Sequence, residues 1–182
     1  SDSVKTWKDY VHLRGYVKEM QTNSFLNLDN IYTDHLIHNR LNFKVYPSKN
    51  ITVSLELRNR AFYGETIKLQ QPYYAEKLDY DNGEVDLSWV LVNENAFILH
   101  STLDRAYFTY SKDKWDIRVG RQRINWGINL ALNPNDLFNA YNVADFDYTE
   151  RPGTDAVRVQ YYTGATSGFD LVLKPSENKE KW

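Results

Sequence analysis

The stretch "HLIHNRLNFKVYPSKNITVSLELRNRA", residues 35–61, decides the fold class because its hydrophobic residues recur at every second position. In its first half, Ile37, Leu41, Phe43 and Val45 alternate with charged and polar side chains. A short "PSKN" turn follows, and the second half repeats the alternation. Because successive side chains of a β-strand point to opposite faces, the stretch predicts a hairpin with one apolar and one polar face.

The same period of two recurs along the chain and predicts an all-β, antiparallel protein. Long connections are expected at about residues 22–34, 62–97 and 125–155, and they alternate with short turns. Short periplasmic turns alternating with long extracellular loops are typical of outer-membrane barrels, so we predict one transmembrane β-barrel domain over residues 1–182. Seven strands are expected, at residues 9–20, 35–46, 51–61, 98–110, 115–124, 156–162 and 168–174.

The two series of side chains predict two environments for the barrel wall. In hydrocarbon every backbone polar group must be paired within the protein, so a spanning sheet closes and turns its apolar series outward. The residues expected to face lipid are Leu41, Phe43, Val45, Val53, Leu55, Leu57, Phe108 and Ile117. The opposite series is mainly basic, with Glu56, Asp116 and Asp170 as its main acids, and predicts a water-filled lumen that attracts anions. The basic residues expected to line it are Arg14, Lys18, Arg40, Lys44, Arg58, Arg60, Arg105, Arg118 and Arg158.

Aromatic residues are expected at the two membrane interfaces, because rings with one polar end favour the headgroup level. Those beside the short turns are Tyr46, Tyr110, Trp115 and Tyr162. Trp126 is expected either in the outer girdle or as a loop anchor on the "NPND" turn.

The stretch "KDKWDIRVGRQRINWG", residues 112–127, changes from an alternating strand to a cluster of arginines. Gly120 is expected to let the strand bend near the outer rim. Arg121 and Arg123 then lie at the rim, near an acidic loop that includes Asp136.

Composition narrows the function classes. The chain has no cysteine, which excludes disulfides, iron–sulfur clusters and thiolate zinc sites. Its start lacks the features of a signal peptide, so the protein is either cytosolic or has already lost its signal. The acidic loops and the lack of a binding motif disfavour nucleic acid as a partner.

Candidate catalytic and metal constellations are weak. His35 and His38 project to opposite sides of one strand and cannot chelate one ion together. Ser101, adjacent to His100, is excluded as its catalytic partner for the same reason. The cluster "DYDNGEVD", residues 79–86, is oxygen-rich enough for Ca²⁺ but lacks EF-hand spacing, which favours a solvated loop. We predict no catalytic residue, no metal site and no cofactor.

The segment "VGRQRINWGINLALNPNDLFNAYN", followed by "DFDYTERPGTDAVRVQYY", resembles one shared by outer-membrane porin-like proteins of Bacteroidetes. In that family a "GRQ…WG" strand end precedes an "NPxD" loop and the next strand. The resemblance covers residues 119–162 and implies export to the outer membrane of a Gram-negative bacterium, with the signal peptide removed. It implies nothing about the substrate.

Together these observations predict a porin or channel for passive passage of small polar, mainly anionic solutes, with outer-membrane lipid as a partner. One alternative is a plugged structural or assembly barrel that binds a partner protein. Another is a soluble β-sandwich that binds carbohydrate, which would predict short, even connections. Seven strands would leave two unpaired edges in lipid, and "PSENKEKW" does not read as a further strand. We therefore expect the sequence to be the N-terminal portion of a larger meander barrel.

Overall fold

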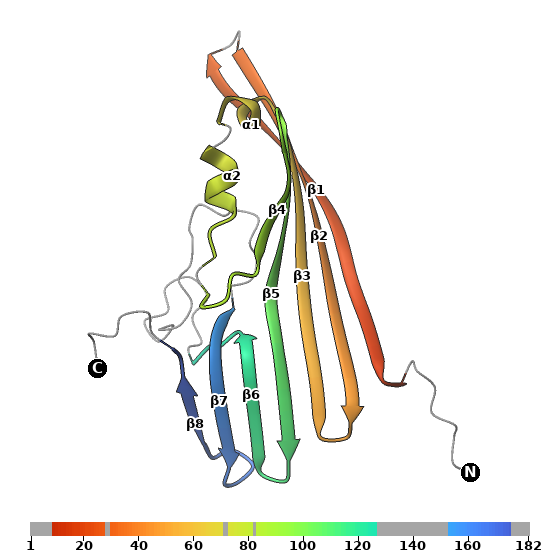
Figure 1. Cartoon of the computed structure of the whole chain (residues 1–182), viewed down its shortest axis with the longest axis vertical. Helices are drawn as coiled ribbons and strands as arrows, with labels where there is room; N and C mark the ends of the chain where they lie inside the picture. The colour runs from red at the N-terminus through yellow and green to blue at the C-terminus, as the bar shows by residue number, and fades with distance from the viewer. Residues whose placement is uncertain (1–8, 28–29, 71–72, 82, 127–152, 176–182) are drawn as a thin grey trace.

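The computed structural model describes residues 9–27, 30–70, 73–81, 83–126 and 153–175, which form one antiparallel sheet with two short helices (Figure 1). The order of the eight described strands is β1-β2-β3-β5-β6-β7-β8, with β4 paired to β5. The predicted all-β, antiparallel architecture is confirmed for the sheet, which is not closed into a barrel within these residues. The bounds are β1 (Val11–Asn27), β2 (Asn30–Ser48), β3 (Ile51–Gly64), α1 (Glu65–Gln70), α2 (Tyr73–Leu78), β4 (Ser88–Glu94), β5 (Phe97–Lys112), β6 (Trp115–Gln122), β7 (Thr154–Tyr162) and β8 (Gly168–Leu173).

The β2–β3 hairpin has the register that the alternation demands. Phe43 lies opposite Leu55, and Leu41 lies opposite Leu57, so the apolar side chains of both strands share one face. Arg40 lies opposite Arg58 on the other face. A slip of one residue would exchange the two faces, which is why the hydrophobic pattern specifies the register.

The prediction of a loop at residues 22–34 is wrong. β1 and β2 remain paired through this region, with Thr22 opposite Asp34 and Phe25 opposite Ile31. The chain therefore reverses between Asn27 and Asn30. The longer hairpin pairs backbone N–H and C=O groups that a loop would leave to solvent or side chains.

The predicted loop 62–97 also contains regular structure that the sequence interpretation missed. It holds α1, α2 and the additional strand β4, so the prediction of seven strands is wrong. β4 pairs with the upper part of β5, residues 97–102, whereas β6 pairs with the lower part of the same edge, residues 106–112. A tight turn at Asn95–Ala96 joins β4 to β5, with Glu94 opposite Phe97, and the apolar run "WVLV" is the local signal for this strand.

The strands β6, β7 and β8 agree with the predicted strands at 115–124, 156–162 and 168–174 to within two residues. Between β6 and β7, residues 127–152 of the predicted loop lie outside the described residues.

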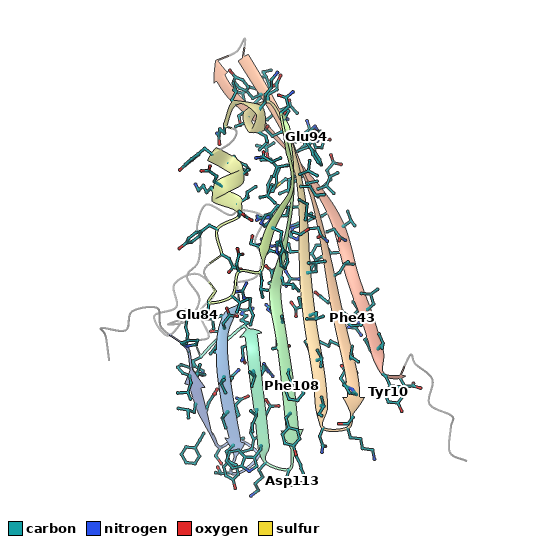
Figure 2. The ribbon with its side chains drawn as sticks, viewed as in Figure 1. Tyr10, Phe43, Glu84, Glu94, Phe108 and Asp113 are labelled. Atoms are coloured by element: carbon teal, nitrogen blue, oxygen red, sulfur yellow. The ribbon has the colours of Figure 1, made fainter. Side chains whose placement is uncertain are left out.

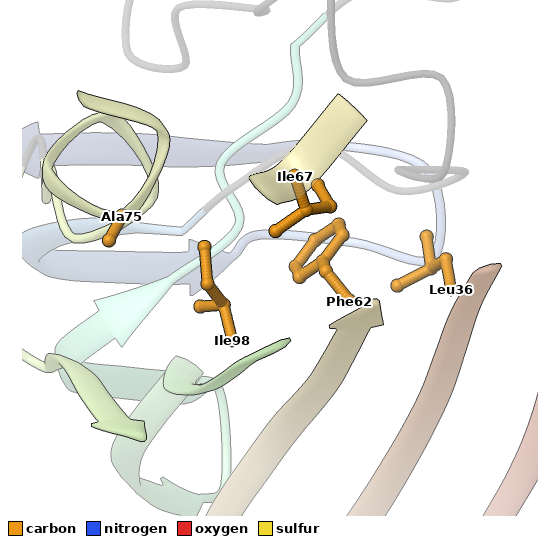
Figure 3. Close-up of a cluster of buried hydrophobic side chains, with 5 residues drawn as sticks. All are labelled: Leu36, Phe62, Ile67, Ala75 and Ile98. Carbon is orange, nitrogen blue, oxygen red and sulfur yellow. The ribbon is translucent and has the colours of Figure 1, made fainter. Parts of the chain in front are cut away.

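A small hydrophobic cluster joins the helices to the upper end of the sheet (Figure 3). Leu36, Phe62 and Ile98 come from β2, β3 and β5, and they meet Ile67 of α1 and Ala75 of α2. Both helices therefore cover the sheet face that carries the charged residues, and they cover it at its upper end only (Figure 1).

Candidate functional site: the polar face of the sheet

The register places all the basic residues predicted to line a lumen on one face of the sheet, which we call the polar face. Arg40, Arg58 and Arg60 are buried there, whereas Arg14 and Lys44 are exposed. The full set is Arg14, Lys18, Arg40, Lys44, Arg58, Arg60, Arg105, Arg118 and Arg158.

A β-bulge in β5 brings one more charged residue to the polar face. Glu56 lies opposite Arg105 and Leu57 lies opposite Leu103, so Asp104 is the extra residue between them. Strict alternation from Phe108 would have placed Asp104 among the apolar side chains. The bulge shifts the alternation of β5 by one residue. Asp104 therefore lies on the polar face, and Leu103 lies on the apolar face.

Asp104 completes a buried network of ion pairs. Arg40 Nη2 contacts Glu56 Oε2 at 2.6 Å, and Arg40 Nη1 contacts Asp104 Oδ2 at 2.9 Å. Arg58 Nε lies 3.3 Å from Asp104 Oδ1, and Arg105 Nη1 lies 3.2 Å from Glu56 Oε2. Arg40 is only 4% exposed. Three arginines thus surround two carboxylates, so the positive wall expected from sequence is largely compensated at this level.

Above the network, His100 lies between Arg60 and Ser88. His100 Nδ1 is 3.4 Å from Arg60 Nη2, and its Nε2 is 2.7 Å from Ser88 Oγ. A guanidinium has no acceptor, so Nδ1 accepts the hydrogen bond and Nε2 carries the ring hydrogen. A histidine in this form donates to the serine and cannot take its proton, so the pair lacks the base of a nucleophilic dyad.

Below the network the polar face carries two separate ion pairs. Arg118 lies over the Tyr107 ring, 5.0 Å from its centroid, and 3.9 Å from Asp116. Arg158 Nε donates to Asp170 Oδ1 at 3.0 Å. Both arginines are partly exposed.

The opposite face of the sheet, the apolar face, carries every residue predicted to contact lipid. Phe43 and Phe108 project from β2 and β5 (Figure 2). Phe108 is 40% exposed and Leu55 is 36% exposed. The full set is Leu41, Phe43, Val45, Val53, Leu55, Leu57, Phe108 and Ile117.

The predicted interface aromatics divide between the two faces. Tyr110 and Trp115 lie on the apolar face, and Trp115 continues across the strands to Tyr161, whose ring centroid is 4.6 Å away. Tyr46 instead contacts His12 edge-on from the polar side, and Tyr162 belongs to the polar series of β7. Tyr161, which alternation places on the apolar side, was missed.

Trp126 hydrogen-bonds to the polar face of β8. Its Nε1 donates to Asp170 Oδ2 at 3.0 Å, on the polar face of β8. The carboxylate supplies the acceptor that an indole N–H needs, which accounts for this placement. The "NPND" turn lies outside the described residues.

Arg121 fastens the segment between α2 and β4 to the ends of β6 and β7. Its Nη1 donates to Asp81 Oδ2 at 2.6 Å, its Nε to Asp155 Oδ1 at 3.1 Å, and its Nη2 to the Val85 carbonyl at 2.5 Å. The side chain is 4% exposed. Arg121 lies at the end of β6, and its described acidic partners are Asp81 and Asp155; Asp136, the acid expected near it, lies outside the described residues.

The contacts of Asp81 also decide whether the oxygen-rich cluster, residues 79–86, can bind Ca²⁺. Asp81 also accepts hydrogen bonds from the backbone N–H groups of Gly83 and Leu87, at 2.8 Å each. Its oxygens are therefore committed to a guanidinium and to backbone, which leaves them poor ligands for Ca²⁺. Within the described part of the chain, no group of three or more His, Asp or Glu side chains is placed to hold a metal ion.

Gly120 adopts a φ of 114°, and a Cβ at this position would lie 2.3 Å from the Ala106 carbonyl oxygen. Only glycine allows this approach of β6 to β5, and the pairing of β6 runs through Gly120 without a register shift.

No described helix is long and apolar enough to cross a membrane. Comparison of the chain with known proteins matched no family model, no curated protein and no solved structure.

Proposed function

We propose that this chain forms part of the wall of an outer-membrane β-barrel, and that its polar face lines a passage for small polar, mainly anionic solutes. The observation that carries the proposal is the inverted burial of the sheet. Arginine, histidine and acidic side chains are buried on one face, while leucine, valine and phenylalanine side chains are exposed on the other. In water the reverse arrangement is favoured, whereas a sheet between hydrocarbon and a wet interior requires this one.

The charge of the polar face supports anions as the solute class. Among the described strand residues, the nine basic residues of the face are opposed by Asp34, Glu56, Asp104, Asp116 and Asp170, so the balance remains positive after the ion pairs are counted. A positive wall in a confined aqueous path raises the local concentration of anions.

Planar-bilayer recordings with the purified full-length protein test this function. We expect discrete conductance steps and a reversal potential in a salt gradient that favours the anion. The double variant Arg58→Glu, Arg118→Glu should lower the anion preference, whereas Lys49→Glu in the exposed β2–β3 turn should leave it unchanged. A cation-selective native channel would contradict the proposal.

A plugged barrel that binds a protein partner is the second candidate, and one observation favours it. The two helices and the segment fastened by Arg121 cover the upper end of the polar face, above a network of ion pairs that itself fills space. A protein that requires detergent for extraction and shows heat-modifiable gel mobility, yet never conducts, would favour this candidate. A protein that is soluble without detergent would exclude both and favour the soluble sandwich.

A further inference from the structure

A row of polar side chains crosses the otherwise apolar face. Asn59 Nδ2 donates to Asn39 Oδ1 at 3.0 Å, and Ser101 Oγ donates to Asn59 Oδ1 at 2.6 Å. Asn39 Nδ2 donates in turn to the Tyr16 carbonyl at 3.1 Å. These three residues, on β2, β3 and β5, form what we call the amide row. Each of its members is hydrogen-bonded within the sheet, which is the condition for placing polar groups in hydrocarbon.

A hydrogen-bonded glutamate–histidine pair lies further along this face, on the side away from the β2–β3 turn. Glu19 Oε1 and His35 Nδ1 are 3.0 Å apart, and the His35 ring stacks on Tyr63 with centroids 4.5 Å apart. Between this cluster and Tyr110, the apolar-face series of β1, β2, β3 and β5 contains no charged residue among those described. A glutamate hydrogen-bonded to a histidine beside a tyrosine suits a membrane–water interface, where polar groups reach water.

Strand length decides between the amide row and the Glu19–His35–Tyr63 cluster as the limit of lipid contact. A transmembrane β-strand needs about 9–11 residues when tilted by about 45°. On β3, the segment between Ile51, which lies opposite the interface aromatic Tyr110, and Tyr63 is residues 52–62, eleven residues. A limit at Asn59 would leave residues 52–58, seven residues, which is too short.

We propose that lipid contact extends from Tyr110 to the Glu19–His35–Tyr63 cluster, so that the amide row is embedded in the hydrocarbon. The tip of the β1–β2 hairpin then stands in the headgroup region or in water. This inference rests on the proposed function, because it specifies which part of the apolar face meets the lipid.

Site-directed spin labelling tests the limit directly, because the cysteine-free chain allows single labels at chosen positions. Leu55, Ile37 and Ile31 lie along the apolar face and are each at least 36% exposed. In the full-length protein reconstituted into phosphatidylcholine vesicles, labels at Leu55 and Ile37 should collide with oxygen and be shielded from a water-soluble nickel chelate. The label at Ile31 should show the opposite preference.

Other outcomes of the labelling experiment distinguish failure of this inference from failure of the proposed function. If all three labels collide with the nickel chelate, the membrane location itself fails. If Leu55 alone is shielded, the amide row is the limit and this inference is overturned, while the membrane location stands. If the label at Ile31 is also shielded from the chelate, lipid contact extends beyond the Glu19–His35–Tyr63 cluster, and the inference is overturned.

A matched pair of substitutions provides a second readout on the same protein. Asn59→Asp places a carboxylate in the amide row, and we expect the folded, inserted fraction to fall at least roughly tenfold. Asn23→Asp makes the same chemical change beyond the cluster, next to Thr33 and Gln21, which already donate to this side chain. It should leave the inserted fraction unchanged. Equal effects of the two substitutions would overturn the inference.

Discussion

The two faces of β3 place neighbouring residues in opposite surroundings. Arg58 is 8% exposed and contacts the Asp104 carboxylate, whereas Leu55, on the other face, is 36% exposed. A globular protein in water buries the leucine and exposes the arginine. This contrast is what supports the proposal that the apolar face meets an apolar medium, while the polar face holds largely compensated charge.

The largest effect is expected where charge compensation on the polar face is broken. Asp104→Asn should lower the free energy of unfolding by about 3–5 kcal/mol, because it leaves Arg40 and Arg58 short of a buried counter-charge. Asp116→Asn is the matched control, since its arginine is 3.9 Å away and partly exposed, and about 1 kcal/mol or less is expected. Urea titration of the folded protein measures both. Equal losses would mean that the bulge does not place Asp104 in a special position.

The next effect tests the asymmetry between the faces on adjacent residues of β2. Phe43→Arg puts a cation on the apolar face and should destabilise insertion by about 2–4 kcal/mol near the bilayer midplane. Asn42→Arg puts the same side chain on the polar face, opposite Glu56, and should be tolerated. The fraction of folded protein in vesicles reports both outcomes. Normal assembly of Phe43→Arg would show that the apolar face does not meet hydrocarbon.

A smaller and local effect is expected at Arg121, which joins the covering segment to the sheet. Arg121→Gln removes charge-assisted hydrogen bonds to Asp81 and Asp155, each of a kind that contributes about 1.5–3 kcal/mol. We expect faster hydrogen exchange and faster proteolysis between residues 79 and 87, with the strands unaffected. Lys112→Gln, at the exposed end of β5, serves as control. Unchanged protection of the segment would mean that other contacts hold it.

The smallest effect concerns the close approach of β6 and β5. Gly120→Ala should destabilise the fold by about 1–3 kcal/mol, because alanine is strained at a φ of 114° and its Cβ meets a carbonyl oxygen. At Gly164, in the β7–β8 turn, the added Cβ would meet only the Ser167 hydroxyl, which can rotate away. Thermal unfolding compares the pair. A larger loss of stability at Gly164 than at Gly120 would contradict the close approach of β6 to β5 at Gly120.

The sequence predicted the two faces because the face of a strand residue depends only on its position relative to its neighbours. Leu55 and Arg58 fall on their observed faces by this rule alone. The rule fails at Asp104, where a bulge shifts the phase, because the bulge depends on how β5 pairs with β3. The rule also places Tyr46, next to Val45, on the polar face, where its ring meets His12.

By itself, the sequence determined an antiparallel sheet with an apolar and a basic face, and the hairpins at Ser48–Ile51 and Lys112–Trp115. Tertiary structure decided which carboxylates meet the arginines, how β4 and β6 share one edge of β5, and that the helices cover the polar face. It also decided that position 120, where β6 approaches β5, requires glycine. The physical reason is the distance along the sequence between the residues that interact. Alternation is encoded between adjacent residues, whereas ion pairs and strand partners join residues such as Arg40 and Asp104, 64 positions apart.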